Sequence, residues 1–424
     1  MNTRLLLPTG LAALLLLGCS CSRQAESPDQ APGGAAPEAA EATAPDVSDA
    51  TDGAAAPAGQ ATGEQALALI NAGLDWLKAN QSEDGSWSDP NYPGLSALAL
   101  WAMARSDRAD LEEARAKAAA YIVRYVRSDG SIYKPATGGR GTGGLSTYNT
   151  AICMTALHAY DKVRFQAEIL KAREFIASSQ LEGDSSVGGG GFGYDKPTEG
   201  GRPQRADMSN TGLALMSMRL TQDVEDNRPV ESAKADVDWA SALAFVESMQ
   251  ISSADHPEAD GGFGYEMQGE RRGPPPAGER KDPPEEAPPG TAKKRESLRT
   301  FGSMTYAGIE SMIYAQVDRT DPRVRSAIAW AGRNWTVEEN PGQGIRGLYY
   351  YYVIMAKALA LMGEEGLVAE DGTPIDWRGD LVAQLAKTRD EEGFWANEDN
   401  TFWESDPSLV TAYAVLCLQS ALGL

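Results

Sequence analysis

Two aspartates, Asp207 and Asp406, each stand directly before an apolar segment with helical spacing, and tyrosines recur within such segments. A carboxylate paired with a tyrosine can act as general acid and base, for instance in the elimination or hydrolysis of a glycan. Burial in a cavity would raise the pKa of that carboxyl toward its working range. We therefore take Asp207, Asp406 and Tyr306 as candidate catalytic residues. The alternative is structural, because an aspartate at such a place is a typical N-cap that accepts hydrogen bonds from the first helical amides.

Further side chains of these apolar segments could line a ligand site. They combine aromatic surface with hydroxyl or carboxyl groups, and they are Tyr148, Glu310, Tyr349, Tyr350, Tyr351, Tyr352 and Tyr413. Tyrosines also pack well between helices while their hydroxyl tips form hydrogen bonds. A site therefore requires that the segments surround a common centre.

Hydrophobic spacing from residue 64 to residue 424 predicts helices in pairs. The first members are amphipathic, at about 64–80, 111–126, 165–179, 238–250, 322–336 and 377–388. The second members are apolar all round, at about 94–105, 145–160, 208–220, 302–316, 347–362 and 407–422. A helix with one polar face lies outside, whereas an apolar helix is enclosed, so six pairs predict an all-α fold of two concentric rings.

A loop with an acidic residue, glycine and an aromatic recurs between the members of these pairs. The clearest examples are Asp84-Gly85-Ser86-Trp87, Gly190-Gly191-Phe192-Gly193-Tyr194, Gly261-Gly262-Phe263-Gly264-Tyr265 and Glu392-Gly393-Phe394-Trp395. Glycine permits the positive φ of a reversal, and the aromatic can hold the loop against the neighbouring unit. Since a helix pair cannot bury its apolar face alone, the repeat predicts an array with one continuous core.

The segment Gln81 to Trp87 resembles the glutamine-to-tryptophan repeat of the prenyltransferase and squalene-cyclase family, and the Gly-Gly-Phe-Gly-Tyr loops support the resemblance. The resemblance covers nearly all of residues 64–424 and implies an α/α toroid. It is specific for the fold and not for the activity, because such toroids include cyclases, protein prenyltransferases, polysaccharide lyases and thioester domains. Function must come from the site itself.

The motifs that carry catalysis in that family are altered here. The cyclases use Asp-x-Asp-Asp, whereas this chain has Asp207-Met208-Ser209-Asn210. The zinc-dependent members carry Asp-x-Cys, and Ser209 and Ser408 stand at the comparable places. With only two histidines in the chain, a histidine-rich metal site is excluded. We therefore expect no metal and no cofactor.

The amino terminus predicts export and anchoring. Arg4 precedes an apolar run from Leu5 to Leu17 that is too short to span a bilayer, so residues 1–18 read as a signal peptide. The ending Leu16-Leu17-Gly18-Cys19 resembles a bacterial lipobox, which implies that Cys19 is lipidated; Ser20 after it favours the outer membrane. Residues 19–63, rich in Ala, Pro and acidic residues, predict a disordered tether.

Two other features of the sequence limit the possible functions. A formal net charge of −22 argues against nucleic acid as a partner. A segment rich in proline and charge, about 268–297, predicts a solvated insertion at one rim of the ring, with a lid or docking arm as the alternative.

Two hypotheses from different classes remain. The first is a noncatalytic envelope lipoprotein, facing the periplasm or the exterior, whose toroid binds an apolar, glycan or protein ligand at its centre. The second is an extracytoplasmic enzyme of the terpenoid-cyclase-like superfamily, of cyclase or polysaccharide lyase or hydrolase type. The loss of the proton-donor and metal motifs favours the first, and the aromatic inner segments keep the second open.

Overall fold

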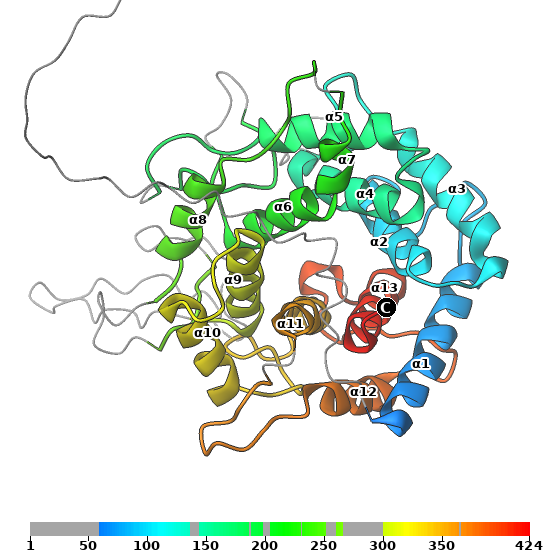
Figure 1. Cartoon of the computed structure of the whole chain (residues 1–424). Coiled ribbons are helices and arrows are strands. Elements are labelled where there is room, and N and C mark those ends of the chain that lie inside the picture. Colours follow the sequence, from blue (N-terminus) through cyan, green and yellow to red (C-terminus); the bar gives the residue numbers. More distant parts are fainter. Residues whose placement is uncertain are drawn as a thin grey trace, which may run out of the picture. The chain divides into compact units, whose positions relative to one another are not determined.

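The helices of the computed structural model form six pairs that are arranged in an inner and an outer ring (Figure 1). The structure describes residues 59–135, 144–185, 188–197, 204–229, 231–251, 260–265, 300–363 and 366–424, all of which belong to the compact unit Asp46–Leu424. The predicted signal peptide, nearly all of the predicted tether and the insertion at 268–297 lie outside these residues. The predicted all-α toroid with two concentric rings is confirmed.

The bounds of the helices follow the predicted pairs closely. The outer members are α1 (Gln60–Ala79), α3 (Glu112–Val123), α5 (Gln166–Ala177), α8 (Trp239–Ser248), α10 (Pro322–Arg333) and α12 (Trp377–Thr388). The inner members are α2 (Pro93–Ala104), α4 (Ser146–Asp161), α6 (Met208–Leu220), α9 (Gly302–Tyr314), α11 (Leu348–Met362) and α13 (Pro407–Leu422). A short helix, α7 (Gln222–Asp226), follows α6, and 3-10 turns occupy Ala109–Leu111 and Thr401–Trp403.

Burial separates the two rings as the hydrophobic pattern predicts. In α2 every residue from Pro93 to Met103 is buried. In α10 burial is confined to one face, which begins at Val324 and recurs at Ala327 and Trp330. A stripe at this spacing covers one side of a helix, so α10 lies outside and presents its polar side to solvent.

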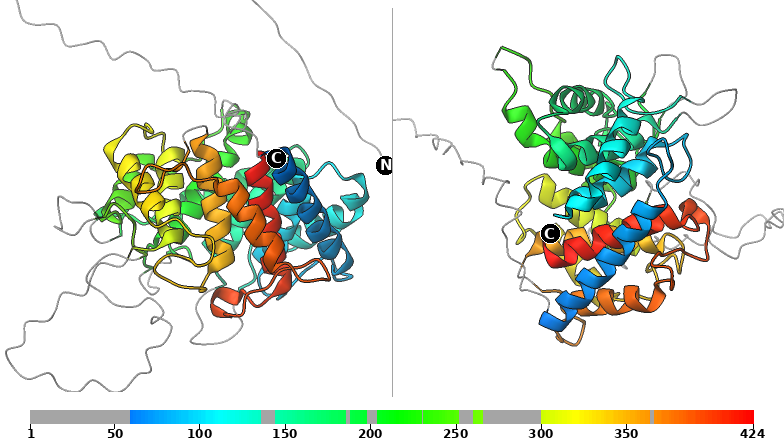
Figure 2. Two further views of the ribbon diagram at one scale, coloured as in Figure 1. Left: turned by 90° about the horizontal axis from the view of Figure 1, so that it is seen from below. Right: turned by 90° about the vertical axis from the view of Figure 1, so that its right-hand side faces the viewer.

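The ring closes on itself. Each inner helix packs against the next in the order α2, α4, α6, α9, α11, α13, and α13 packs against α2 (Figures 1 and 2). The first outer helix, α1, contacts both α12 and α13 and thereby joins the two ends of the repeat array. Within the described ranges, every helix is too short or too polar to span a lipid bilayer.

A glutamine at the end of an outer helix ties neighbouring units together. Gln81 Nε2 donates to the carbonyl of Gly85 in its own loop (3.2 Å) and to that of Ala114 in the next outer helix (2.9 Å). Gln180 and Gln250 make the same pair of bonds in the third and fourth units. The glutamine of the repeat therefore bridges units rather than serving a ligand.

The loop glycine allows close approach to the next unit. Gly190 has φ +87°, and a Cβ at this position would lie 2.0 Å from the carbonyl oxygen of Ser241 in α8. Only glycine fits both the left-handed backbone and the contact.

A hydroxyl in the first two turns of five of the six inner helices accepts a hydrogen bond from the preceding loop, at or equivalent to its aromatic position. The backbone N–H of Phe192 donates to Thr211 Oγ1 (3.0 Å), and that of Trp395 donates to Thr411 Oγ1 (3.1 Å). Equivalent bonds reach Ser96, Thr150 and Thr305. The fifth unit lacks the aromatic loop, yet α9 and α11 pack directly, so its loop Asn340–Gly344 opens no gap between these helices.

Among the described residues, arginines bind the carboxyl ends of five of the six inner helices. The last carbonyls of a helix have no partner within it and carry partial negative charge, which favours a cation there. Each of these arginines donates to at least one such carbonyl of a helix to which it does not itself belong. Arg115 binds the end of α2, Arg173 that of α6, Arg219 that of α9, Arg319 that of α11 and Arg378 that of α13.

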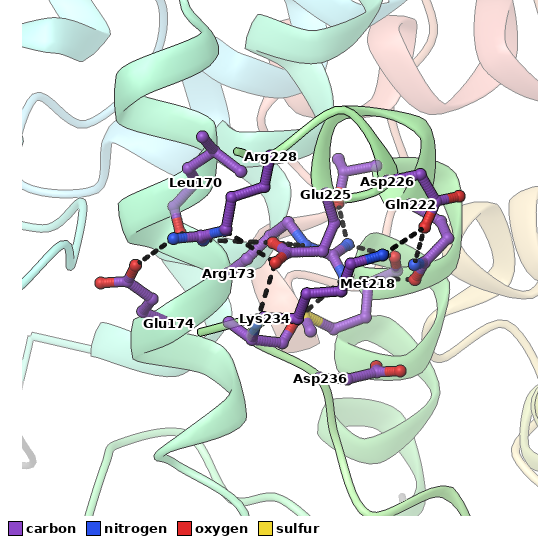
Figure 3. Close-up of polar contacts among 12 residues, drawn as sticks. Leu170, Arg173, Glu174, Met218, Gln222, Glu225, Asp226, Arg228, Lys234 and Asp236 are labelled. Carbon is purple, nitrogen blue, oxygen red and sulfur yellow. Dashed lines mark hydrogen bonds and ion pairs between the residues drawn. The ribbon is translucent and has the colours of Figure 1, made fainter. Parts of the chain in front are cut away.

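Arg173 is the most buried of these arginines, with a side chain 0% exposed. Figure 3 shows that Arg173 and Arg228 both point at the carboxylate of Glu225, with nitrogen-to-oxygen distances of 3.1 and 2.7 Å. Arg173 also donates to the carbonyl of Met218 at the end of α6. The cluster binds α5, α6 and α7 together, and its charges are already paired, so we assign it a structural role.

Candidate functional site

A cavity of about 310 Å³ lies at the centre of the inner ring. All six inner helices contribute to its wall. On α2 the lining residues recur at every third position, as Tyr92, Leu95, Leu98 and Trp101. At 1.5 Å of rise per residue, the nine steps from Tyr92 to Trp101 give a depth of about 14 Å. The cavity is thus deep enough for an elongated small molecule and of a size that ligand pockets commonly have.

The wall is mainly apolar and aromatic. Its lining includes aliphatic and thioether side chains from all six inner helices, namely Leu98, Ile152, Leu213, Met304, Val353 and Leu409. Such a surface favours hydrocarbon and offers few partners to the many hydroxyl groups of a glycan.

The mouth of the cavity lies where the inner helices begin. The most exposed lining residues belong to this rim, and they are Phe402 (52%), Trp403 (39%) and Tyr194 (37%). Phe402 and Trp403 both have left-handed backbone, with φ of +63° and +65°, a conformation that costs about 1–2 kcal/mol for non-glycine residues. The Trp403 ring packs edge-on against Tyr92 at 4.6 Å between centroids. Exposed aromatic side chains on left-handed backbone thus form an apolar rim at the opening.

An ion pair lies on the wall at the inner end. Lys357 Nζ in α11 is 3.2 Å from Glu310 Oε1 in α9, and the two side chains are 12% and 3% exposed. The same ammonium lies 2.9 Å from Met216 Sδ and 5.9 Å from the centre of the Trp101 ring. Four inner helices therefore meet around one cation that is largely enclosed.

A second carboxylate, Glu404, also reaches the wall. It is fully buried and accepts hydrogen bonds from the backbone N–H groups of Tyr349 (3.2 Å) and Tyr350 (2.8 Å) and from Asn397 Nδ2 (2.7 Å). Burial raises the pKa of Glu404, while these donors act in the opposite direction. Glu404 therefore caps α11 from outside that helix.

The tyrosines of the wall are neutral hydrogen-bonding groups. Burial is the main reason that the pKa values of Tyr148, Tyr350 and Tyr413 lie above the ordinary value of 10. Tyr350 donates to Ser209 Oγ (3.1 Å), and the hydroxyls of Tyr194 and Tyr265 are 3.2 Å apart. The phenols bind one another and the wall.

Asp207 and Asp406 cap helices. Asp207 accepts from the backbone N–H (2.9 Å) and the side-chain amide (2.7 Å) of Asn210. Asp406 accepts from the N–H groups of Ser408 (2.8 Å) and Leu409 (3.2 Å) and from the Ser88 hydroxyl. Neither carboxylate lines the cavity. The hydrogen bonds are those of the structural alternative, and catalytic roles for both residues stay predictions.

The sequence-derived candidates divide by helix face. Tyr148, Glu310, Tyr350 and Tyr413 line the cavity, whereas Tyr306, Tyr349, Tyr351 and Tyr352 do not. In a helix successive side chains are turned by about 100°, so only one of four consecutive tyrosines can face the centre. Tyr351 and Tyr352 instead donate to the carbonyls of Thr336 and Val337, and Tyr306 packs on Tyr351 with ring centres 5.9 Å apart.

Sequence reasoning missed Lys357, Trp101 and the rim residues Phe402 and Trp403. Lys357 had a readable signal, because it is the single charged residue of α11, as Glu310 is of α9. A lone charge in an enclosed helix needs a partner, and two opposite ones in the third turn of adjacent inner helices predict each other. Phe402 and Trp403 lie in a turn without such a signal.

Known structures share this architecture. MstE, a type II terpene cyclase from Scytonema, superposes in its apo form with a TM-score of 0.51 and 12% identity over 85% of this chain and 99% of that chain. A variant of MstE in complex with geranylgeranyl dihydroxybenzoate, its substrate, gives 0.50 and 12% over 87% and 100%. A protein from Actinoplanes gives 0.50 and 13% over 84% and 99%. The chain has the toroid fold of the type II terpene cyclases.

The likeness extends to the fold and no further at this level of identity. No protein-family model matches the sequence, and no curated protein matches it. Among the described residues, no group of three or more histidine, cysteine or acidic side chains is placed to hold a metal ion. The predicted resemblance to the cyclase and prenyltransferase toroids is confirmed as a resemblance of fold.

Both carboxylates that line the cavity have partners within the protein. Protonation of an alkene requires a carboxylic acid whose proton faces the substrate. Glu310 is paired with Lys357, and Glu404 accepts bonds from the amides of α11. A carboxylate oxygen that accepts such a contact does not hold a proton that it could give to a substrate.

Proposed function

We propose that the protein is an envelope lipoprotein, anchored through Cys19, whose toroid binds an elongated apolar molecule in its central cavity without cyclase or prenyl-transfer chemistry. The observation that carries the proposal is the apolar wall, about 14 Å deep by helix rise, with aromatic residues at its mouth. At roughly 25 cal/mol per Å² of apolar surface removed from water, such a wall favours a hydrocarbon chain. The substrate that MstE binds carries a geranylgeranyl group, which supports the choice of an apolar ligand.

The binding part of the proposal is tested by obstructing the cavity. The mature polypeptide from Ser20 onward, produced without its lipid, is titrated with the fluorescent apolar probe phenylnaphthylamine. Leu213 lies on the wall in α6, and Leu213→Trp adds an indole ring to the cavity. Leu220→Trp is the matched control, because Leu220 belongs to the same helix, is 37% exposed and does not line the cavity.

We expect saturable probe binding to the unchanged chain and to Leu220→Trp, and at least tenfold weaker binding to Leu213→Trp. Equal binding by the two variants would contradict the proposed site. Circular dichroism and unfolding curves of both variants show that any difference does not arise from loss of the fold.

The noncatalytic part is tested at the two aspartates. Asp207→Asn and Asp406→Asn each weaken a cap and should lower the free energy of unfolding by about 1 kcal/mol. Probe binding should stay unchanged, because neither carboxylate lines the cavity. If a turnover reaction were found that either variant abolished without loss of stability, the enzyme hypothesis would replace this one.

The anchor is tested separately by mass spectrometry of the protein extracted from membranes. We expect a diacylglyceryl group on Cys19 and release of the Cys19→Ser chain from the membrane fraction. An unmodified amino terminus in membrane-bound protein would refute the anchor and leave the cavity proposal standing.

A further inference from the structure

The ion pair of the cavity has unused hydrogen-bonding capacity. A lysine ammonium has three donors; Lys357 directs its nitrogen at Glu310 Oε1 (3.2 Å) and at a thioether sulfur, which is a weak acceptor. Glu310 Oε1 is buried and forms no hydrogen bond among the described residues, apart from this ion contact, although the carboxylate as a whole also interacts with the buried phenol of Tyr314. Buried charges are costly unless further hydrogen bonds satisfy them. The inner end of an otherwise apolar cavity therefore presents both a donor and an acceptor.

The charges of the pair decide which polar group fits. A carboxylate or phosphate would gain the lysine but face the negative Glu310, and an amine would gain Glu310 but face the positive Lys357. A hydroxyl group can accept from Lys357 and donate to Glu310 at once, and it adds no charge. A water molecule has the same capacity, so the hydroxyl of a ligand would take the place of water.

We propose that the ligand is an apolar molecule with one terminal hydroxyl group, which enters hydroxyl first and is held at the inner end by Lys357 and Glu310. This inference rests on the apolar binding proposed above. Leu98, Ile152 and Met304 line the wall beside the hydrocarbon part, and Trp403 lies at the mouth. The pair thus selects alcohols over hydrocarbons and over fatty acids of the same length.

The test compares ligands that differ at one end only. Decanol, decane, decanoate and the ether methoxynonane each compete with phenylnaphthylamine on the unlipidated mature chain. The ether has a similar length to decanol and can accept but not donate a hydrogen bond. We expect decanol to bind at least tenfold more tightly than each of the other three, because hydrogen bonds to charged groups are among the strong ones.

A double variant assigns the preference to the pair. Lys357→Met with Glu310→Met replaces both charges by apolar side chains of similar size, a change that is often neutral or stabilising. The preference for decanol over decane should fall at least tenfold relative to the unchanged chain, while decane binding is retained. The ratio between proteins cancels the different solubilities of the two ligands.

The outcomes separate the two proposals. If decane binds and decanol has no advantage on the unchanged chain, the alcohol inference fails and apolar binding stands. An equal preference in both proteins would also overturn the role of the pair. If none of the four compounds competes with the probe, both proposals fail. The comparison of decanol with its ether uses the unchanged chain alone, so it tests the alcohol inference even if the double variant does not fold.

Discussion

The contact between each loop glycine and the next outer helix should make a measurable contribution to stability. Gly190 has φ +87°, and an added Cβ would lie 2.0 Å from the carbonyl oxygen of Ser241. Because real Cβ contacts are essentially never under 3.0 Å, the loop would have to move by about 1 Å. Gln180 Nε2, which bonds both Gly190 and Asp238 at 2.9 Å, cannot keep both partners after such a shift.

The expected loss of stability is the sum of the backbone cost and the cost of the two lost Gln180 hydrogen bonds. An alanine in left-handed backbone costs about 1–2 kcal/mol. Loss of the two bonds of Gln180 adds about 1 kcal/mol each, so Gly190→Ala should lower the free energy of unfolding by about 3–4 kcal/mol. Gly372 provides a matched control, because it also has φ +87° but no atom within 4 Å of its added Cβ. Gly372→Ala should therefore cost only the backbone term of about 1–2 kcal/mol.

Urea unfolding followed by far-ultraviolet circular dichroism measures both variants under one set of conditions. The difference between them, about 2 kcal/mol, isolates the bridge between units from backbone strain. Equal costs for Gly190→Ala and Gly372→Ala would refute the argument that the loops tie neighbouring outer helices together.

Two further predictions concern buried polar groups. Thr211→Val removes the acceptor of the Phe192 N–H and should lower the free energy of unfolding in urea by about 1–3 kcal/mol. Thr147→Val, at a buried hydroxyl that has no hydrogen-bond partner among the described residues, should be neutral or stabilising. Similar losses for the two variants would contradict the stabilising role of the Thr211 hydroxyl. Burial holds the pKa of His158 below the ordinary 6.5 despite its contact with Asp223 (2.7 Å), so the unfolded chain binds the proton more readily. The contribution of neutral His158 to stability is therefore complete above pH 6.5 and is lost as the pH falls through the lower folded pKa. The free energy of unfolding, measured from pH 8 to pH 5, should fall less steeply for His158→Gln than for the unchanged chain. An equal fall in both proteins would contradict this prediction.

The fold was predictable because local and global signals agree. Apolar segments with polar outer partners, and glycine-aromatic loops between them, specify helix pairs that only a closed array can bury. The bridging role of Gln81 was not readable, because its partner Ala114 lies in another unit. Its repetition at Gln180 and Gln250 is visible only once the loops are superimposed in space.

The site was predictable only in part, for reasons of helix rotation and of contacts between distant segments. A run of four tyrosines marks an enclosed helix but does not say that Tyr350 alone faces the centre. Glu404 caps α11 from a turn that precedes another helix, a contact that no local pattern shows. The lone charges Glu310 and Lys357, by contrast, could have been matched from their positions in adjacent inner helices.

The most direct test of the central claim is a crystal structure of the unlipidated chain with decanol that carries bromine at its far end. The anomalous signal of bromine locates that end of the ligand without reference to the protein. The account predicts a bromine peak at the mouth, beside Phe402 and Trp403, with density that continues to a hydroxyl between Lys357 and Glu310. A central cavity without ligand, or bromine only on the outer surface, would contradict it.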